Sequence, residues 1–183
     1  IHQPEDDNSL KTAIYRLKYD EHFFLQLLMA LKKKNHEESF GRIFSEKGKY
    51  EKDIFNHLDF TLTNAQINVL REIRVDLASA KPMNRLIQGD VGCGKTVVAM
   101  LTASIIVGNG SQVAIMAPTE ILAEQHYDSF IKYCNDLDVT CEILISNIKD
   151  KEKKNIYKRL KNGEIQIIVG THALIQEKVK FKV

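Results

Sequence analysis

The chain has 183 residues, of which 44% are hydrophobic and 27% charged, with 26 basic and 24 acidic side chains. This length and balance are typical of a globular domain with an appendage that can bury a core. The net charge of +2 does not indicate nucleic-acid binding, although it allows a local basic path, and no apolar run suits a membrane-spanning helix or a signal peptide.

The first part of the chain differs in pattern from the rest, so we divide it into a helical linker segment, 1–59, and a domain, 60–183. Within residues 9–31, apolar side chains recur at helical spacing, which predicts one long amphipathic helix that must pack on something. Either Asn8 or Ser9 could cap its start. The remainder of this segment is polar and mixed.

From Phe60 onward, short apolar runs alternate with helical patterns. Thr63 and Gln66 have the spacing of a capping box, which predicts the start of a helix. Continuous apolar strands between helices are typical of a parallel sheet that is covered on both faces, so the predicted fold class is α/β. The predicted strands are 86–87, 113–116, 139–145 and 165–169, with a possible edge strand at 178–183; the predicted helices after the first are 96–107, one from 120, and 149–162.

One segment matches the phosphate-loop pattern G-x-x-x-x-G-K-[ST] at every fixed position, between a short apolar strand and a helix. Its residues are Gly89, Asp90, Val91, Gly92, Cys93, Gly94, Lys95 and Thr96. The glycines let backbone N–H groups surround phosphate oxygens, and the helix N-terminus adds partial positive charge. Lys95 supplies a full charge to the β- and γ-phosphates, and Thr96 offers its hydroxyl to Mg²⁺, so these two are the candidate catalytic residues. The predicted ligands are ATP and Mg²⁺.

Two residues upstream of this loop are candidates for binding adenine. The amide of Gln66 can donate to and accept from the adenine edge, and the ring of Phe60 could stack on the base. The alternative is that Gln66 serves only as the partner of Thr63 in the capping box, although both roles can coexist.

Two further segments follow predicted strands, at the edge where open α/β sheets bind ligands. Their hydroxyl and backbone N–H groups could hold a phosphodiester backbone without reading its sequence. The candidate nucleic-acid residues are Pro118, Thr119, Gly170, Thr171 and His172. Taken singly, each segment could equally be a plain strand-to-helix turn.

These motifs and their flanks resemble superfamily-2 ATP-dependent DNA helicases, and most closely the RecG family. The runs that carry the resemblance are 82–92, 117–126 and 169–176, with further matches at 1–4, 16–21 and 25–27. The resemblance spans nearly the whole chain and is weakest from 35 to 56. The resemblance implies a RecA-like first motor lobe preceded by a linker helix, in a bacterial cytoplasmic enzyme that acts on branched or forked DNA in recombination and repair. It also implies Gln66 on adenine, the loop on phosphates, and Thr119 and Thr171 near the DNA backbone, with His126 as a less certain neighbour.

The sequence departs from that family at three points. No acidic D-E-x-H pair follows the loop; by resemblance it belongs beyond Val183, on a strand within the sheet, so the lobe is expected to be incomplete. Asp59 stands where relatives commonly have proline. The chain begins with Ile1, which suggests a start inside a longer protein. We therefore expect this chain to bind nucleotide without unwinding DNA by itself.

Several alternatives stay open. The motor of a transcription-repair coupling translocase is similar, and a truncated, non-catalytic remnant that binds nucleotide or DNA is a different class. Another P-loop enzyme fits less well, because the strand-end segments would have no purpose there. The basic residues between 149 and 161 spread round their helix, which favours a solvated face over a phosphate contact. Three scattered cysteines do not form a zinc motif and favour a reducing compartment.

Overall fold

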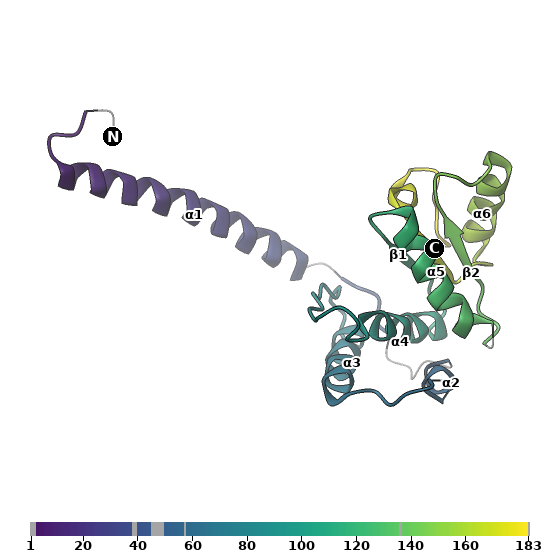
Figure 1. The fold of residues 1–183 in the computed structure, drawn as a ribbon. Coiled ribbons are helices and arrows are strands. Elements are labelled where there is room, and N and C mark those ends of the chain that lie inside the picture. Colours follow the sequence, from purple (N-terminus) through teal and green to yellow (C-terminus); the bar gives the residue numbers. More distant parts are fainter. Residues whose placement is uncertain (1–2, 38–39, 45–49, 57, 136, 183) are drawn as a thin grey trace. The chain divides into compact units, whose positions relative to one another are not determined.

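The structure is a computed structural model that describes residues 3–37, 40–44, 50–56, 58–135 and 137–182. Contacts divide the chain into two compact units, one formed by Ile1–Arg42 with Ala80–Pro82, the other by Ile43–Ser79 with Met83–Val183. Figure 1 shows the elements of both units. Each unit is a self-contained body and is described by itself below.

The first unit consists mainly of one long helix, α1 (Asp7–Glu37), which confirms the predicted helix. The helix begins earlier than predicted, because Asp6 rather than Asn8 or Ser9 caps it. The backbone N–H of Ser9 donates to Asp6 Oδ1 at 2.6 Å, and the backbone N–H of Asp6 donates to Ser9 Oγ at 3.2 Å. Its apolar side chains are largely exposed, as at Phe24 and Leu28, each 60% exposed.

The second unit is an α/β body with a parallel sheet. Its helices are α2 (Glu51–Asn56), α3 (Asn64–Leu77), α4 (Lys95–Gly108), α5 (Glu120–Cys134), α6 (Asp150–Asn162) and the 3₁₀ turn η1 (His172–Ile175); its strands are β1 (Val113–Met116), β2 (Cys141–Leu144) and β3 (Ile167–Gly170). The strand order is β1-β3-β2, so β3 pairs in parallel with both neighbours. The predicted fold class is confirmed.

Both faces of the sheet are covered, as the continuous apolar strands predicted. Alternate residues of β3 point to opposite faces. Ile167 and Val169 belong to the apolar cluster that contains buried residues of α3, α4 and α5. Ile168, between them, belongs to a second cluster with Ile156 and Leu160 of α6. Two packed layers around a central sheet are the usual architecture of an α/β domain.

Two predicted strands are wrong. Residues 86–87 form no strand, because no strand among the described residues pairs with the segment from 83 to 89, and Leu86 is 89% exposed. Residues 178–182 also form none. Their alternation instead places Val179 and Phe181 against the α6 cluster, while the backbone N–H of Lys182 donates to the Gln112 side chain at 2.8 Å.

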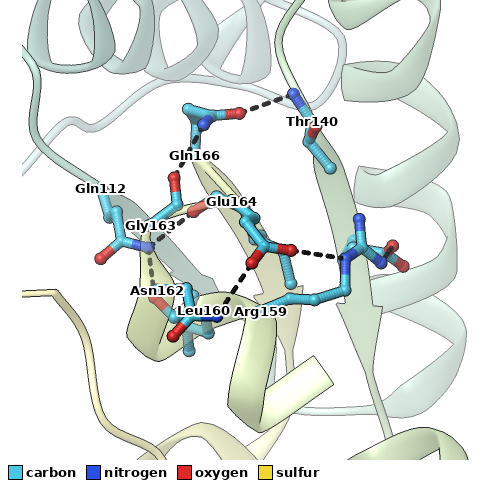
Figure 2. A network of polar contacts seen from close by, with 10 residues as sticks. Gln112, Thr140, Arg159, Leu160, Asn162, Gly163, Glu164 and Gln166 are labelled. Carbon is cyan, nitrogen blue, oxygen red and sulfur yellow. Dashed lines mark hydrogen bonds and ion pairs between the residues drawn. The ribbon is translucent and has the colours of Figure 1, made fainter. Parts of the chain in front are cut away.

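Two glutamine side chains form hydrogen bonds with backbone groups at the amino ends of the strands (Figure 2). Gln112, just before β1, donates from Nε2 to the carbonyl oxygens of Leu160 at 2.8 Å and Ile165 at 2.6 Å. Gln166, just before β3, accepts from the N–H of Thr140 at 2.8 Å and donates to the carbonyl of Gly163 at 3.1 Å. These bonds satisfy backbone groups such as the Ile165 carbonyl and the Thr140 N–H in a partly buried position, while the Leu160 carbonyl also accepts from the N–H of Gly163. The carboxyl ends of β1 and β3 carry the candidate nucleic-acid residues.

No helix within the described ranges is long and apolar enough to cross a lipid bilayer.

Candidate nucleotide-binding site

The backbone of the segment from Gly89 to Thr96 forms a tight turn that opens α4. Gly92 and Gly94 have φ angles of +81° and +86°, in the left-handed region that favours glycine. Gly94 is the N-cap of α4, so Lys95 and Thr96 are the first two helical residues. The first N–H groups of a helix have no partner within the helix, and they can therefore bind an anion.

The side chain of Lys95 turns back over this loop. Its Nζ donates to the carbonyl oxygens of Gly89 and Asp90, both at 2.7 Å, and lies 3.6 Å from the Sγ of Cys93. Within the part of the chain that the structure describes, the oxygen atoms that hold the ammonium group are these two backbone carbonyls, at the position where the sequence predicts phosphate binding. A cation whose partners are exposed carbonyls can exchange them for phosphate oxygens, which bind it more strongly.

The capping box predicted for α3 is confirmed. Thr63 Oγ1 accepts from the N–H of Gln66 at 3.3 Å, and Gln66 Oε1 accepts from the N–H of Thr63 at 2.8 Å. The other half of the Gln66 amide makes a contact that the sequence did not predict: Nε2 donates to the carbonyl of Cys93 at 2.9 Å. The candidate adenine residue is therefore bonded directly to the phosphate loop.

Gly94 lies at this junction, and two features of the position favour a residue without a side chain. Its φ of +86° favours glycine, and a Cβ at this position would overlap with Nε2 of Gln66. Gly92 has a similar φ but open space around it. The glycine of the G-K-[ST] triplet thus allows Gln66 to reach the loop.

The remaining candidate residues of this site lie on exposed or half-buried surface. Phe60 precedes the α3 cap with its side chain 47% exposed, so its ring face is accessible for stacking. Asp90, Val91 and Cys93 are exposed, while Thr96 is half-buried in the first turn of α4. The structure thus brings Gln66 together with the loop, whereas the placement of Phe60 on adenine stays a prediction.

Sequence reasoning missed one residue next to this site, Arg85. Its guanidinium group binds two carboxylates of α3: Nε and Nη2 lie 2.8 and 2.7 Å from Asp76 Oδ2, and Nη1 pairs with Glu72. The hydrogen bond to Asp76 raises the pKa of this guanidinium above its usual value. The signal was present in the sequence, because carboxylates spaced four residues apart share one face of a helix.

The candidate nucleic-acid segments lie side by side at the carboxyl edge of the sheet. Met116 is in register with Gly170, and the N–H of Ala117 donates to the carbonyl of Gly170 at 2.8 Å. Thr119 caps α5, with its Oγ1 accepting from the N–H of Leu122 at 3.3 Å. Because a hydroxyl that accepts as a cap can still donate, Thr119 keeps one bond for a ligand.

The other candidate residues of this edge differ in accessibility. Pro118 and His172 are exposed, and His126 on α5 is half-buried. Thr171 is 8% exposed, and its side chain makes no capping bond to the turn η1 that follows it. Gly170 has a structural reason to be glycine, because a Cβ there would overlap with the carbonyl oxygen of Leu144 on β2.

Comparison with known proteins gives one family match and several close relatives. A family model described as DEAD/DEAH box helicase matches residues 63–182. The ATP-dependent DNA helicase RecG of Aquifex aeolicus (strain VF5) is 44% identical over 188 residues, covering 100% of this chain and 24% of the relative. The protein of the same name from Bacillus subtilis (strain 168) is 46% identical over 183 residues, covering 100% and 27%.

The fold is also similar to that of a solved protein. A structure of RecG bound to a three-way DNA junction matches with a TM-score of 0.83 and 44% identity, covering 95% of this chain and 24% of that one. The chain spans about a quarter of the length of the relatives it matches.

Proposed function

Because this chain belongs to the DEAD/DEAH box helicase family, we propose that it provides the nucleotide-binding part of an ATP-dependent DNA helicase of the RecG type. The proposed substrate of the whole enzyme is branched or forked DNA in recombination and repair, since the similar solved protein is bound to a three-way junction. Residues 60–183 would form the first motor lobe and residues 1–59 a linker, in a bacterial cytoplasmic protein.

One observation carries this proposal: Lys95 points into a glycine loop that opens a helix, and only loop carbonyls hold its Nζ among the oxygen atoms of the described residues. When a triphosphate enters, its oxygens replace the carbonyls of Gly89 and Asp90 as acceptors for the ammonium group. The N–H groups at the start of α4 bind the same phosphates. Mg²⁺, when bound, would neutralise phosphate charge and polarise the γ-phosphate, with the hydroxyl of Thr96 as the ligand from this chain.

The adenine end of the nucleotide is assigned to Gln66. Its amide already bonds to Thr63 and Cys93, so it has the defined orientation that recognition of a base requires. Binding of adenine through Nε2 would compete with the bond to the Cys93 carbonyl. The group assigned to the base, Gln66, and the loop assigned to the phosphates would thus be hydrogen-bonded to each other before nucleotide binds.

The nucleic-acid backbone is assigned to the carboxyl edge of β1 and β3. Thr119 offers a hydroxyl donor, and exposed Pro118 and His172 flank it. These groups contact phosphate and sugar rather than base edges, which suits a motor that moves along any sequence. The segments containing Thr171 and Gly170 would shape this surface.

The nucleotide part is tested by titration calorimetry of ATP with Mg²⁺ into the purified chain. We expect Lys95→Ala to weaken ATP binding roughly 10- to 100-fold, because it removes a charged hydrogen-bonding group from the phosphates. Lys132→Ala, on the exposed end of α5, is the matched control and should leave the affinity unchanged. Equal affinities of the Lys95 variant and the unaltered chain would refute the proposal.

The DNA part is tested separately by anisotropy with a three-way junction and a linear duplex of equal length. We expect His172→Ala to weaken binding about 2- to 10-fold, the value of one lost hydrogen bond, for all sequences alike. Asn155→Ala, on the exposed face of α6, is the control. If His172→Ala binds both DNAs as the unaltered chain does, this edge is not the DNA contact.

A further inference from the structure

The segment that enters the phosphate loop lacks the usual support of a strand. Residues 83–89 pair with no strand among the described residues, so ladder hydrogen bonds do not fix their position. Met83 and Ile87 pack partly against the apolar core, but apolar contacts have little directional preference. No backbone–backbone hydrogen bond joins residues 83–88 to another described segment, so their directional contacts with the rest of the unit come from polar side chains.

Arg85 makes such contacts. Its planar guanidinium group binds Asp76 through Nε and Nη2 and Glu72 through Nη1. One side chain therefore contacts two successive turns of α3. The Arg85 side chain is 29% exposed, which means that solvent screens these charges and that their free energy is small. Their geometric effect is not screened, since a forked donor between two carboxylates admits few orientations.

Helix α3 is thus attached to the loop region at two places. Near its start, Gln66 bonds to the carbonyl of Cys93 within the loop. Near its end, Glu72 and Asp76 bind Arg85, four residues before the loop begins. Glu72 and Asp76 lie six and ten residues after Gln66 along α3, about 9 and 15 Å in a helix, so the two attachments together fix both its position and its direction.

Only one of these attachments persists when nucleotide binds in the proposed manner. Adenine competes with the Cys93 carbonyl for the Gln66 amide, whereas the proposed binding mode uses neither Arg85 nor its two carboxylates. We propose that Arg85 is a positioning residue, which sets the spacing between Gln66 and the phosphate loop so that one ATP molecule can reach both. This inference rests on the proposed function and names the residue that couples its two binding groups.

The test uses two ligands that differ in how much of the site they need. Tripolyphosphate with Mg²⁺ needs the loop alone, whereas ATP needs the loop and Gln66 at the correct spacing. We expect Arg85→Ala to lower the ratio of ATP affinity to tripolyphosphate affinity about tenfold. Arg85→Lys should lower the ratio to an intermediate extent, because an ammonium group cannot bridge both carboxylates. Arg71→Ala, an exposed arginine of the same helix that bonds to Asn68, is the control.

A ratio measured in one sample does not depend on the fraction of folded protein, so a general loss of stability leaves it unchanged. The double variant Glu72→Gln with Asp76→Asn weakens the same contacts by removing the charges of both carboxylates. It should lower the ratio of ATP affinity to tripolyphosphate affinity as Arg85→Ala does. Equal losses for both ligands, or no loss, would overturn the inference while the proposed function stands. If the unaltered chain binds ATP no better than tripolyphosphate, the adenine assignment itself fails and the inference fails with it.

Discussion

The side-chain amide of Gln66 donates a hydrogen bond of 2.9 Å to the carbonyl oxygen of Cys93, 27 residues further along the chain. This bond joins the first turn of α3 to the phosphate loop. The oxygen of the same amide, Oε1, accepts from the N–H of Thr63 and closes the capping box, so the amide is engaged on both sides. One side chain therefore contributes to the stability of a helix and to the arrangement of a binding loop.

These two contributions can be separated by mutation. Gln66→Ala should lower the free energy of unfolding by about 1 kcal/mol through loss of the cap and should reduce the preference for ATP over GTP. Thr63→Ala should cost a similar free energy and keep the preference, because the Gln66 amide remains. Urea unfolding and competitive nucleotide titration measure the two effects. A Gln66→Ala chain that still discriminates ATP from GTP would show that this amide does not read adenine.

The two left-handed glycines of the loop should respond differently to alanine. Gly92→Ala meets open space and should cost about 1–2 kcal/mol of backbone strain. Gly94→Ala suffers the same strain and in addition places a Cβ where Nε2 of Gln66 lies, which displaces the amide assigned to adenine, so its loss of ATP affinity should be the larger. Thermal unfolding and ATP titration of the pair provide the comparison. Equal losses of affinity would mean that the Gln66 contact is irrelevant to binding.

The glutamine before β1 should matter for stability far from the nucleotide. Gln112→Ala leaves the Ile165 carbonyl without its donor, takes one of two donors from the Leu160 carbonyl and releases the backbone N–H of Lys182, which should cost about 2 kcal/mol. Gln176→Ala, at an exposed position, is the control and should be nearly neutral. Urea unfolding measures the difference, and hydrogen exchange at the Lys182 amide should accelerate in the Gln112 variant. Unchanged stability would contradict this role.

The three free cysteines should react at very different rates with a disulfide reagent at pH 8. Cys93 is exposed, whereas Cys134 and Cys141 are buried. The adjacent Cys134 thiol, together with burial, raises the pKa of Cys141 and keeps that thiol protonated and unreactive. We expect one rapid equivalent, absent in Cys93→Ser and slowed by ATP, which would cover the loop. Rapid reaction of a second thiol in the native chain would contradict the burial.

Local chemistry made much of this site predictable from sequence. The spacing of Thr63 and Gln66 determines a capping box wherever a helix begins, and the glycines and Lys95 form the loop because their own backbone angles and charge require it. The parallel sheet followed from apolar strands that are buried on both faces. These are properties of neighbouring residues, and no tertiary information was needed.

The failures share one cause, dependence on a distant partner. Leu86 and Ile87 have the composition of a strand, yet a strand exists only where another pairs with it. The alternation at 178–182 is that of a strand, but Gln112 rather than a strand bonds to this segment. The contact of Gln66 with Cys93 spans 27 residues, and those of Arg85 with Asp76 and Glu72 cross from one element to another over 9 and 13 residues. No local pattern specifies which partner such groups meet.

The hydrogen bonds of Lys95 to carbonyls of its own loop affect which anions the loop would bind. Its bonds to the carbonyls of Gly89 and Asp90 must break before any phosphate takes their place, so the free energy of opening is subtracted from the affinity of every ligand. A triphosphate offsets this cost with many simultaneous bonds to backbone N–H groups, whereas orthophosphate or sulfate forms too few. In the proposed function, the loop would therefore set an affinity threshold that a triphosphate passes and that orthophosphate or sulfate does not.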